Sequence, residues 1–229
     1  MAVSLGAGEA LAAAGRRGVG DMTVMTAEQR DTLRDKIKAA ESRTSAEFVT
    51  VIADSAEPYL FIPTLFAAVA TLLISGVALF FEGSLGLTTI EFYVGQVIVF
   101  ACLALIFRIP EIRFALVPKS IRHSRASRLA RHMFLDLGMT ETEDRNAVLF
   151  FVAMGERYVE VIADVGLQQK LEDEGVWDKI VEKFVEDVRE GEVADGFTRA
   201  IDGCAEVMAQ HFPNRDGAPN RFSDRLIEI

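Results

Sequence analysis

Residues 59–81 read YLFIPTLFAAVATLLISGVALFF and residues 92–107 read FYVGQVIVFACLALIF; these two uncharged stretches decide the architecture of the chain. A helix rises 1.5 Å per residue, so the first stretch gives about 34 Å of helix, enough to cross a hydrocarbon core of about 30 Å. The second gives about 24 Å and reaches full length if Arg108 snorkels and Ile109 continues the helix. A buried helix of a soluble protein is the alternative interpretation of each stretch. Because only ten residues separate them, the sequence predicts a transmembrane hairpin over residues 59–109, with spans at 59–81 and 92–109.

The distribution of basic residues predicts how this hairpin is oriented. Residues 108–131 carry seven basic residues and one acidic residue, whereas the connecting loop, residues 82–91, has no Lys or Arg. Lys and Arg accumulate on the cytoplasmic side of membrane spans. We therefore expect a multi-pass protein of the cell (inner) membrane, with both termini and the soluble domain in the cytoplasm. Residues 1–24 lack the polarity of a signal peptide and are expected to form a disordered leader, with Met25 as an alternative start to Met1.

Composition limits the possible partners. The chain is 50% hydrophobic with a mean hydropathy of +0.23, and the two apolar stretches account for the excess. The formal net charge is −10, and residues 132–229 carry 22 acidic and 10 basic residues, which argues against nucleic-acid binding. Arg122, Arg125 and Arg128 lie just after the hairpin and are candidates for binding lipid head groups. The alternative is that they serve only as a topology signal.

The remaining sequence predicts one soluble domain in two parts, residues 25–58 and residues 110–213. A capping box at Thr26 and Gln29 opens a helix to about residue 43, and the β-forming residues 47–53 follow it. After the hairpin, we expect a helix over 120–137 closed by Gly138, strands at 146–153 and 158–163, and helices at 176–189 and 192–211. The run 146–153 is apolar on both faces and is expected to be a central strand. The fold class is therefore α/β (α+β), a mixed sheet flanked by helices and interrupted by the hairpin, with a disordered tail at residues 214–229.

Several short motifs in these segments resemble the TPM domain family, which includes thylakoid acid phosphatases tied to photosystem repair. The matching segments are RTSAEFV at 43–49, NAVL at 146–149, RYVEVI at 157–162, and the glycines Gly138, Gly166, Gly191 and Gly196. A closer resemblance is to the bacterial branch that has a hairpin within the domain and reads Glu-Arg, Glu and Ala-Asp-x-Gly, here Glu156, Arg157, Glu160, Ala163, Asp164 and Gly166. The resemblance implies a TPM-like mixed sheet, a phosphatase-like activity and a divalent cation, Ca²⁺ or Mg²⁺. The chain departs from the family at Arg145, where the family has aspartate, and at Ala147, where it has glycine.

Three acidic residues of the second hairpin strand are the candidate catalytic residues. Glu156, Glu160 and Asp164 have even spacing, so an uninterrupted strand would place them on one face. Four residues of strand span about 13 Å, which is too far for neighbouring carboxylates to share a metal. A metal site would need further carboxylates from residues 172–174 or the loop 141–144, and the sequence itself indicates no metal site or cofactor.

The alternative interpretation is a solvated or salt-bridged sheet face. On that interpretation, Arg145 and Arg157, the candidate binding residues of this segment, pair with the carboxylates.

Two functions follow from these patterns. The first is a membrane-anchored binding or assembly module for other membrane proteins or for a second copy of the chain, held at the lipid bilayer. The alternative is an enzyme, a metal-assisted, acid phosphatase-like hydrolase of phosphomonoesters. The apolar stretches contain no ionisable residue, which argues against a transport path.

Overall fold

A computed structural model describes residues 2–5, 26–80, 86, 88–170, 175–190, 192–214 and 226–229. The chain divides into two compact units. One unit, here called the sheet domain, joins Met1–Ala56 to Arg122–Ile229, and the other, the hairpin unit, is Glu57–Ile121. The sheet domain is thus built from two segments that the hairpin unit separates in sequence.

A five-stranded mixed sheet lies at the centre of the sheet domain, with strand order β1-β4-β3-β2-β5. The strands are β1 (Ala2–Leu5), β2 (Phe48–Ala53), β3 (Val148–Ala153), β4 (Tyr158–Ala163) and β5 (Leu226–Glu228). β3 pairs parallel with β2 and antiparallel with β4, to which a tight turn connects it. β1 runs antiparallel to β4, and β5 runs parallel to β2.

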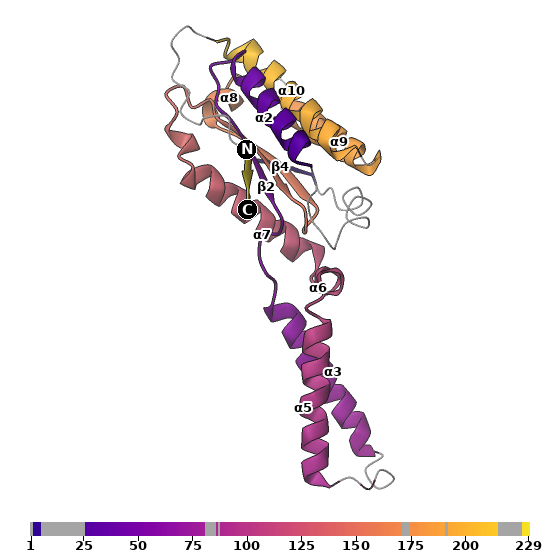
Figure 1. The fold of residues 1–229 in the computed structure, drawn as a ribbon. Helices are drawn as coiled ribbons and strands as arrows, with labels where there is room; N and C mark the ends of the chain where they lie inside the picture. The colour runs from indigo at the N-terminus through magenta and orange to yellow at the C-terminus, as the bar shows by residue number, and fades with distance from the viewer. Residues whose placement is uncertain are drawn as a thin grey trace. The chain divides into compact units, whose positions relative to one another are not determined.

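Helices cover both faces of this sheet (Figure 1). The helices α2 (Ala27–Glu41), α9 (Val176–Glu190) and α10 (Val193–His211) pack on one face, where Phe150 contacts Phe184 and Phe197 edge to face. The helix α7 (Lys119–Asp136) packs on the other face through Ala126, Ala130 and Phe134. All six residues of each of β2, β3 and β4 are buried. The prediction that 146–153 contains a central strand covered on two sides is therefore confirmed.

Most predicted helices and strands are present with small shifts of their ends. The capping box between Thr26 and Gln29 forms and opens α2. Gly138 follows α7 with a φ of 70°, in the left-handed region that favours glycine after a helix. The sequence analysis did not predict three short helical segments: α6 (Pro110–Leu116), α8 (Val165–Gln168) and the 3₁₀ turn Met139–Glu141. Each is too short for hydrophobic periodicity to reveal it.

The two ends of the chain differ from the expectation of disorder. Residues 2–5 lie in the expected leader but form β1, and residues 226–228 lie in the expected tail but form β5. Both are short strands at the edges of the sheet, and they form by pairing with β4 and β2. The rest of the expected leader, residues 6–24, and residues 215–225 of the tail lie outside the described residues.

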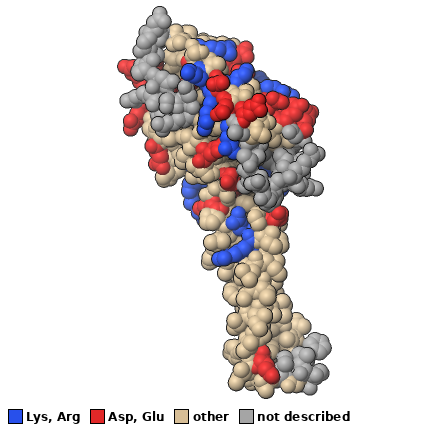
Figure 2. Space-filling model, viewed as in Figure 1, with Lys and Arg blue, Asp and Glu red and all other residues tan. Residues whose placement is uncertain are grey.

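The hairpin unit contains the two apolar helices α3 (Phe61–Phe80) and α5 (Thr89–Ile106). By length and composition, Phe61–Leu79 and Thr89–Ile106 could each cross a membrane. Only 17% of the most apolar part of the first helix, and 0% of that of the second, is buried in the structure. A core helix of a soluble protein is instead mostly buried. Figure 2 shows the helices of this unit as almost free of charged side chains along their length.

The second apolar helix begins earlier than predicted. α5 starts at Thr89 rather than at residue 92, because Thr88 and Glu91 form a capping box that satisfies the first backbone N–H groups. Glu91, expected in the connecting loop, therefore lies in the first turn of α5. The helix also ends at Ile106 rather than at residue 109.

Candidate functional site

Of the three candidate carboxylates, Glu160 lies within β4, and Glu156 and Asp164 flank this strand, whose side chains alternate between the two faces of the sheet. Val159 and Val161 join the core beneath α9 and α10, whereas Tyr158 and Ile162 join the core beneath α7. Glu160 lies between Tyr158 and Ile162 on the α7 side and accepts a hydrogen bond from Ser127 of α7. The predicted alternation is confirmed, but this face is covered by a helix and is not solvated.

Glu160 is a fully buried carboxylate, with a relative exposure of 0%. Its Oε2 accepts a hydrogen bond from the Tyr158 hydroxyl at 3.0 Å, and its Oε1 accepts one from the Ser127 hydroxyl at 3.4 Å. Burial raises the pKa of Glu160 above its usual value, while these two hydrogen bonds and the charge of Arg131 lower it by less.

Glu156 precedes β4 and is also buried, with a relative exposure of 1%. Its Oε1 accepts hydrogen bonds from the Ser55 hydroxyl and the Ala56 backbone N–H, each at 3.0 Å. These bonds tie the β3–β4 turn to the segment that follows β2. Its Oε2 is buried and has no hydrogen-bond partner among the described residues.

Asp164 follows β4 and forms an ion pair with Arg145 of the loop before β3. Arg145 donates two hydrogen bonds to Asp164, from Nε to Oδ2 at 2.6 Å and from Nη2 to Oδ1 at 2.9 Å. The Asp164 Oδ1 also accepts a hydrogen bond from the N–H of Val165, which caps α8. The hydrogen bond to Asp164 raises the pKa of Arg145 above its usual value. The pairing of Arg145 with a carboxylate of this segment, expected as the alternative to catalysis, is present in the structure.

Backbone geometry explains the neighbouring glycine. The N–H of Gly166 donates to the carbonyl of Arg145 at 2.8 Å. A Cβ at Gly166 would lie 2.6 Å from that carbonyl oxygen and closer still to the carbonyl oxygen of Asp144. The Asp-x-Gly stretch at 164–166 therefore has a structural role, since it holds the 144–145 loop against the start of α8.

The other sequence candidates occupy different environments. Arg157 lies in the β3–β4 turn, is half-buried and has a φ of 56°. Along α7, Arg122 is buried and its Nε has no hydrogen-bond partner among the described residues, Arg125 is half-buried, and Arg128 is exposed. Of the three arginines predicted to bind lipid head groups, only Arg128 is fully accessible.

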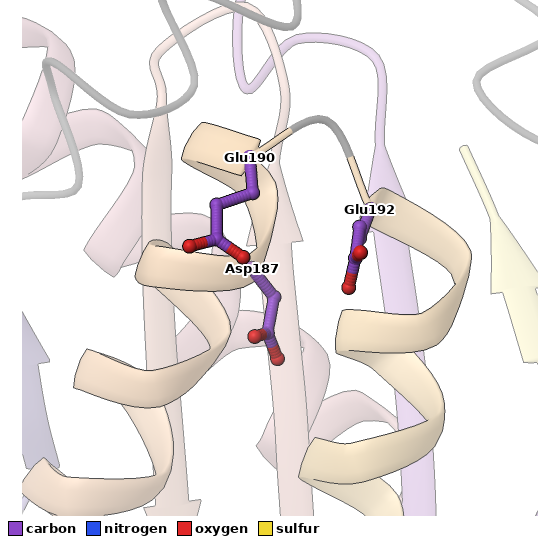
Figure 3. Close-up of side chains that lie close together, drawn as sticks. All are labelled: Asp187, Glu190 and Glu192. Carbon is purple, nitrogen blue, oxygen red and sulfur yellow. The ribbon is translucent and has the colours of Figure 1, made fainter.

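The structure gathers a different set of carboxylates, which the sequence analysis missed. Asp187 and Glu190 at the end of α9 and Glu192 before α10 place carboxylate oxygens within 4.8 Å of one another (Figure 3). This is the one acidic group of metal-binding spacing among the described residues, and it includes none of the three β4 candidates. Residues 171–174, which include the expected recruits at 172–174, lie outside the described residues. The sequence did carry a signal for this acidic group, because Asp187, Glu190 and Glu192 lie at the junction of the predicted helices 176–189 and 192–211.

Arginine and lysine side chains already neutralise this acidic group. Arg199 donates from Nε to Asp187 and from Nη2 to Glu192, both at 2.7 Å, and Lys183 lies 3.6 Å from Asp187. The hydrogen bonds to Asp187 and Glu192 raise the pKa of Arg199. The pKa of Lys183 is raised chiefly by its hydrogen bond to Glu186 and to a smaller extent by Asp187. Oxygen donors at this spacing suit Ca²⁺ or Mg²⁺, but the guanidinium occupies two of the three carboxylates. The residues as they stand therefore form a salt-bridge network that does not fit a resident cation.

A groove of about 400 Å³ runs between α9 and α10. The groove is lined by apolar residues and Gly203 together with polar and charged side chains. The apolar residues are Val176, Ile180, Phe184, Ala200 and Val207; the polar and charged residues are Lys179, Lys183, Arg199, Glu206 and Gln210. A lining of mixed apolar and polar side chains is typical of surfaces that bind other molecules.

Comparisons with known proteins agree with this architecture. The family model for the TPM domain matches residues 110–207. The NMR structure of BA42 protein from the psychrophilic bacterium Bizionia argentinensis is similar in fold, with a TM-score of 0.57 and 15% sequence identity over 93% of this chain and 99% of that one. No curated protein matches the chain.

Proposed function

Because residues 110–207 carry a TPM domain, we propose that this chain is a membrane-anchored TPM-domain protein that binds and assembles other membrane components. The domain is the binding module, and the hairpin of α3 and α5 is its anchor. Partners are other membrane proteins or a second copy of the chain, at the surface of the lipid bilayer.

The observation that carries this proposal is the environment of the three candidate carboxylates in and beside β4. Glu156 holds the segment after β2, Glu160 is enclosed beneath α7, and Asp164 caps α8 and pairs with Arg145. Each carboxylate has a structural role, and they do not converge on one accessible point. A general acid or a metal ligand must reach its substrate or ion, so the binding function is better supported than catalysis.

The groove between α9 and α10 supports the same proposal. Its apolar lining includes the half-buried Val176, Ile180 and Val207, and the pair of helices offers about two turns of continuous surface. We expect a segment of the membrane partner to occupy it.

The proposed location follows from the charges that flank the hairpin. With both termini and the sheet domain in the cytoplasm, the basic residues after the second span lie on the side that Lys and Arg prefer. Of these, Arg128 is the exposed side chain of the predicted lipid-binding set, and we expect it to face anionic head groups.

Co-purification tests the binding function. Full-length protein is cross-linked in native membranes, solubilised and purified, and its partner is identified by mass spectrometry. Gly203→Phe fills the groove, whereas Gly203→Ala adds one methyl group 3.4 Å from Ile180 and is its matched control. We expect a stoichiometric partner with wild type and Gly203→Ala and its loss with Gly203→Phe. The absence of any stoichiometric partner would count against the function itself.

The alternative is a metal-assisted phosphatase: the carboxylates of Asp187, Glu190 and Glu192 would have the spacing of a cation site only if Arg199 were displaced from Asp187 and Glu192. Its test is hydrolysis of a general phosphate ester by purified protein with Mg²⁺, Mn²⁺ or Ca²⁺. Inert protein would rule this alternative out. If hydrolysis is seen, Glu160→Ala, Asp164→Ala and Glu190→Ala identify which carboxylates the rate depends on.

A further inference from the structure

Glu160 is a titratable group enclosed in a mostly apolar layer between the sheet and α7. It is 0% exposed, and the same layer contains Ala126 and Ala130 of α7 and Phe151 of β3. Phe151 lies opposite Glu160 in the β3–β4 register. A carboxylate in such a layer costs free energy unless its charge is compensated.

The compensation around Glu160 comes from neutral donors. Its two hydrogen bonds come from the hydroxyls of Tyr158 and Ser127, and it has no ion pair among the described residues. The cation that acts on it is Arg131, an exposed residue of α7. Another titratable group, His123 of α7, lies beside Tyr158, which donates a hydrogen bond to Glu160; the centroids of the two rings are 5.4 Å apart.

The other strands beside Glu160 add no charge. β3 presents Phe151 and β1 presents Ser4 at the register positions opposite Glu160. Neither side chain is ionisable at physiological pH. On α7, the charge of Arg131 acts on Glu160, His123 lies beside Tyr158, and Arg122 is a further buried ionisable residue.

We propose that Glu160 is a pH-sensitive contact that holds α7 on the sheet when protonated and loosens α7 when ionised. The protonated carboxyl can donate to the Ser127 hydroxyl while it accepts from Tyr158, so both oxygens stay satisfied in a dry layer. The ionised carboxylate only accepts, and its charge is best solvated when α7 moves away and admits water. α7 follows the hairpin in the chain, so this contact controls how firmly the domain holds the segment that leads to its anchor.

The sign of the effect follows from the raised pKa of Glu160 in the folded state. Below the unfolded value the group is protonated in both states, so ionisation imposes no penalty and the folded contact is at its most stable. As the pH rises from the unfolded value through the raised folded value, the unfolded state loses its proton first, so the folded contact is progressively destabilised. Above the folded value the full penalty is present.

Hydrogen–deuterium exchange of full-length protein in detergent micelles tests this contact. Wild type and Glu160→Gln are compared at the same pH, which cancels the intrinsic pH dependence of exchange. We expect α7 amides to exchange severalfold faster in wild type than in Glu160→Gln above the titration, and equally fast at about pH 4, near the unfolded carboxyl value. Glu182→Gln, at an exposed carboxylate of α9, is the matched control and should change nothing.

A second variant keeps the test decisive if Glu160→Gln fails to fold. Arg131→Gln removes the charge that lowers the pKa of Glu160, and its exposed position makes it tolerant of substitution. We expect the pH at which α7 loosens to move upward in Arg131→Gln, which a purely structural role of Arg131 would not produce. Equal α7 exchange in wild type and Glu160→Gln at all pH values, or an unchanged midpoint in Arg131→Gln, would overturn the proposal.

Discussion

Arg145 and Asp164 form a two-pronged ion pair, with Nε–Oδ2 at 2.6 Å and Nη2–Oδ1 at 2.9 Å, across the ends of two adjacent strands. The Asp164 side chain is 3% exposed, whereas that of Arg145 is 46% exposed. Arg145 makes this contact from a backbone with a φ of 52°. The TPM resemblance implies an aspartate at position 145, so Arg145 gives this chain the opposite charge beside the Asp-x-Gly stretch at 164–166.

Replacing Asp164 should destabilise the sheet domain. Asp164→Ala removes the cap of α8 and leaves Arg145 without its partner, and we expect a loss of about 2 kcal/mol after allowing for the exposure of Arg145. The measurement is urea unfolding followed by the fluorescence of Trp177, the single tryptophan, which belongs to α9 and is buried in the core. Glu182→Ala is the control and should cost under about 0.5 kcal/mol. A loss at Asp164 no larger than that of the control would show that the pair contributes no stability.

Glycine replacements should give opposite results at two positions. Gly166→Ala forces a methyl group against the carbonyl oxygens of Asp144 and Arg145, and we expect a loss of more than about 2 kcal/mol. Gly203→Ala lies within α10 and meets only ordinary contacts from Ile180, so the better helix propensity of alanine should stabilise the domain by about 0.5 kcal/mol. The same Trp177 unfolding curve measures both. Equal behaviour of the two variants would contradict the close approach seen at Gly166.

Much of the fold could be predicted because it follows from local patterns. The period of α7 and the apolar runs of β2 and β3 identify each element without knowledge of its neighbours. β1 and β5 could not be found this way, because four and three residues become strands only by pairing with β4 and β2 far away in the sequence.

The site was harder to predict than the fold for the same reason. Even spacing correctly placed Glu160 on one face of β4, but the sequence does not show that α7 closes over that face. The ion pair of Asp164 is made with Arg145, nineteen residues earlier, whose positive φ has no signal in the sequence.

Cation binding should appear when Arg199 is removed. Arg199→Gln frees the carboxylates of Asp187 and Glu192, which lie within 4.8 Å of each other and of Glu190. We expect millimolar Ca²⁺ to raise the Trp177 unfolding midpoint of Arg199→Gln but not of wild type. Stabilisation of wild type by Ca²⁺ would instead favour the metal-assisted alternative. Lys179→Gln removes a charge from the lining of the groove outside this network and controls for a nonspecific effect of Ca²⁺ on the unfolding midpoint.

Cysteine labelling should establish the orientation of the hairpin. In a Cys102→Ser background, Gly86→Cys in the connecting loop should react with an impermeant maleimide on intact cells, whereas Glu182→Cys should react only after permeabilisation. The native Cys204 adds no background, because burial raises the pKa of its thiol to about 12. Reaction of Glu182→Cys in intact cells would place the sheet domain outside and remove the lipid and partner proposals together.

The parallel pairing of β2 with β3 joins Phe48 to Val148, a hundred residues later in the chain. At ribosomal rates of 5–20 residues per second, β2 is synthesised about 5–20 s before the neighbour it needs. During that interval FVTVIA is a nascent β-forming segment without its partner β3, so the sheet cannot form around it until translation has passed both apolar helices.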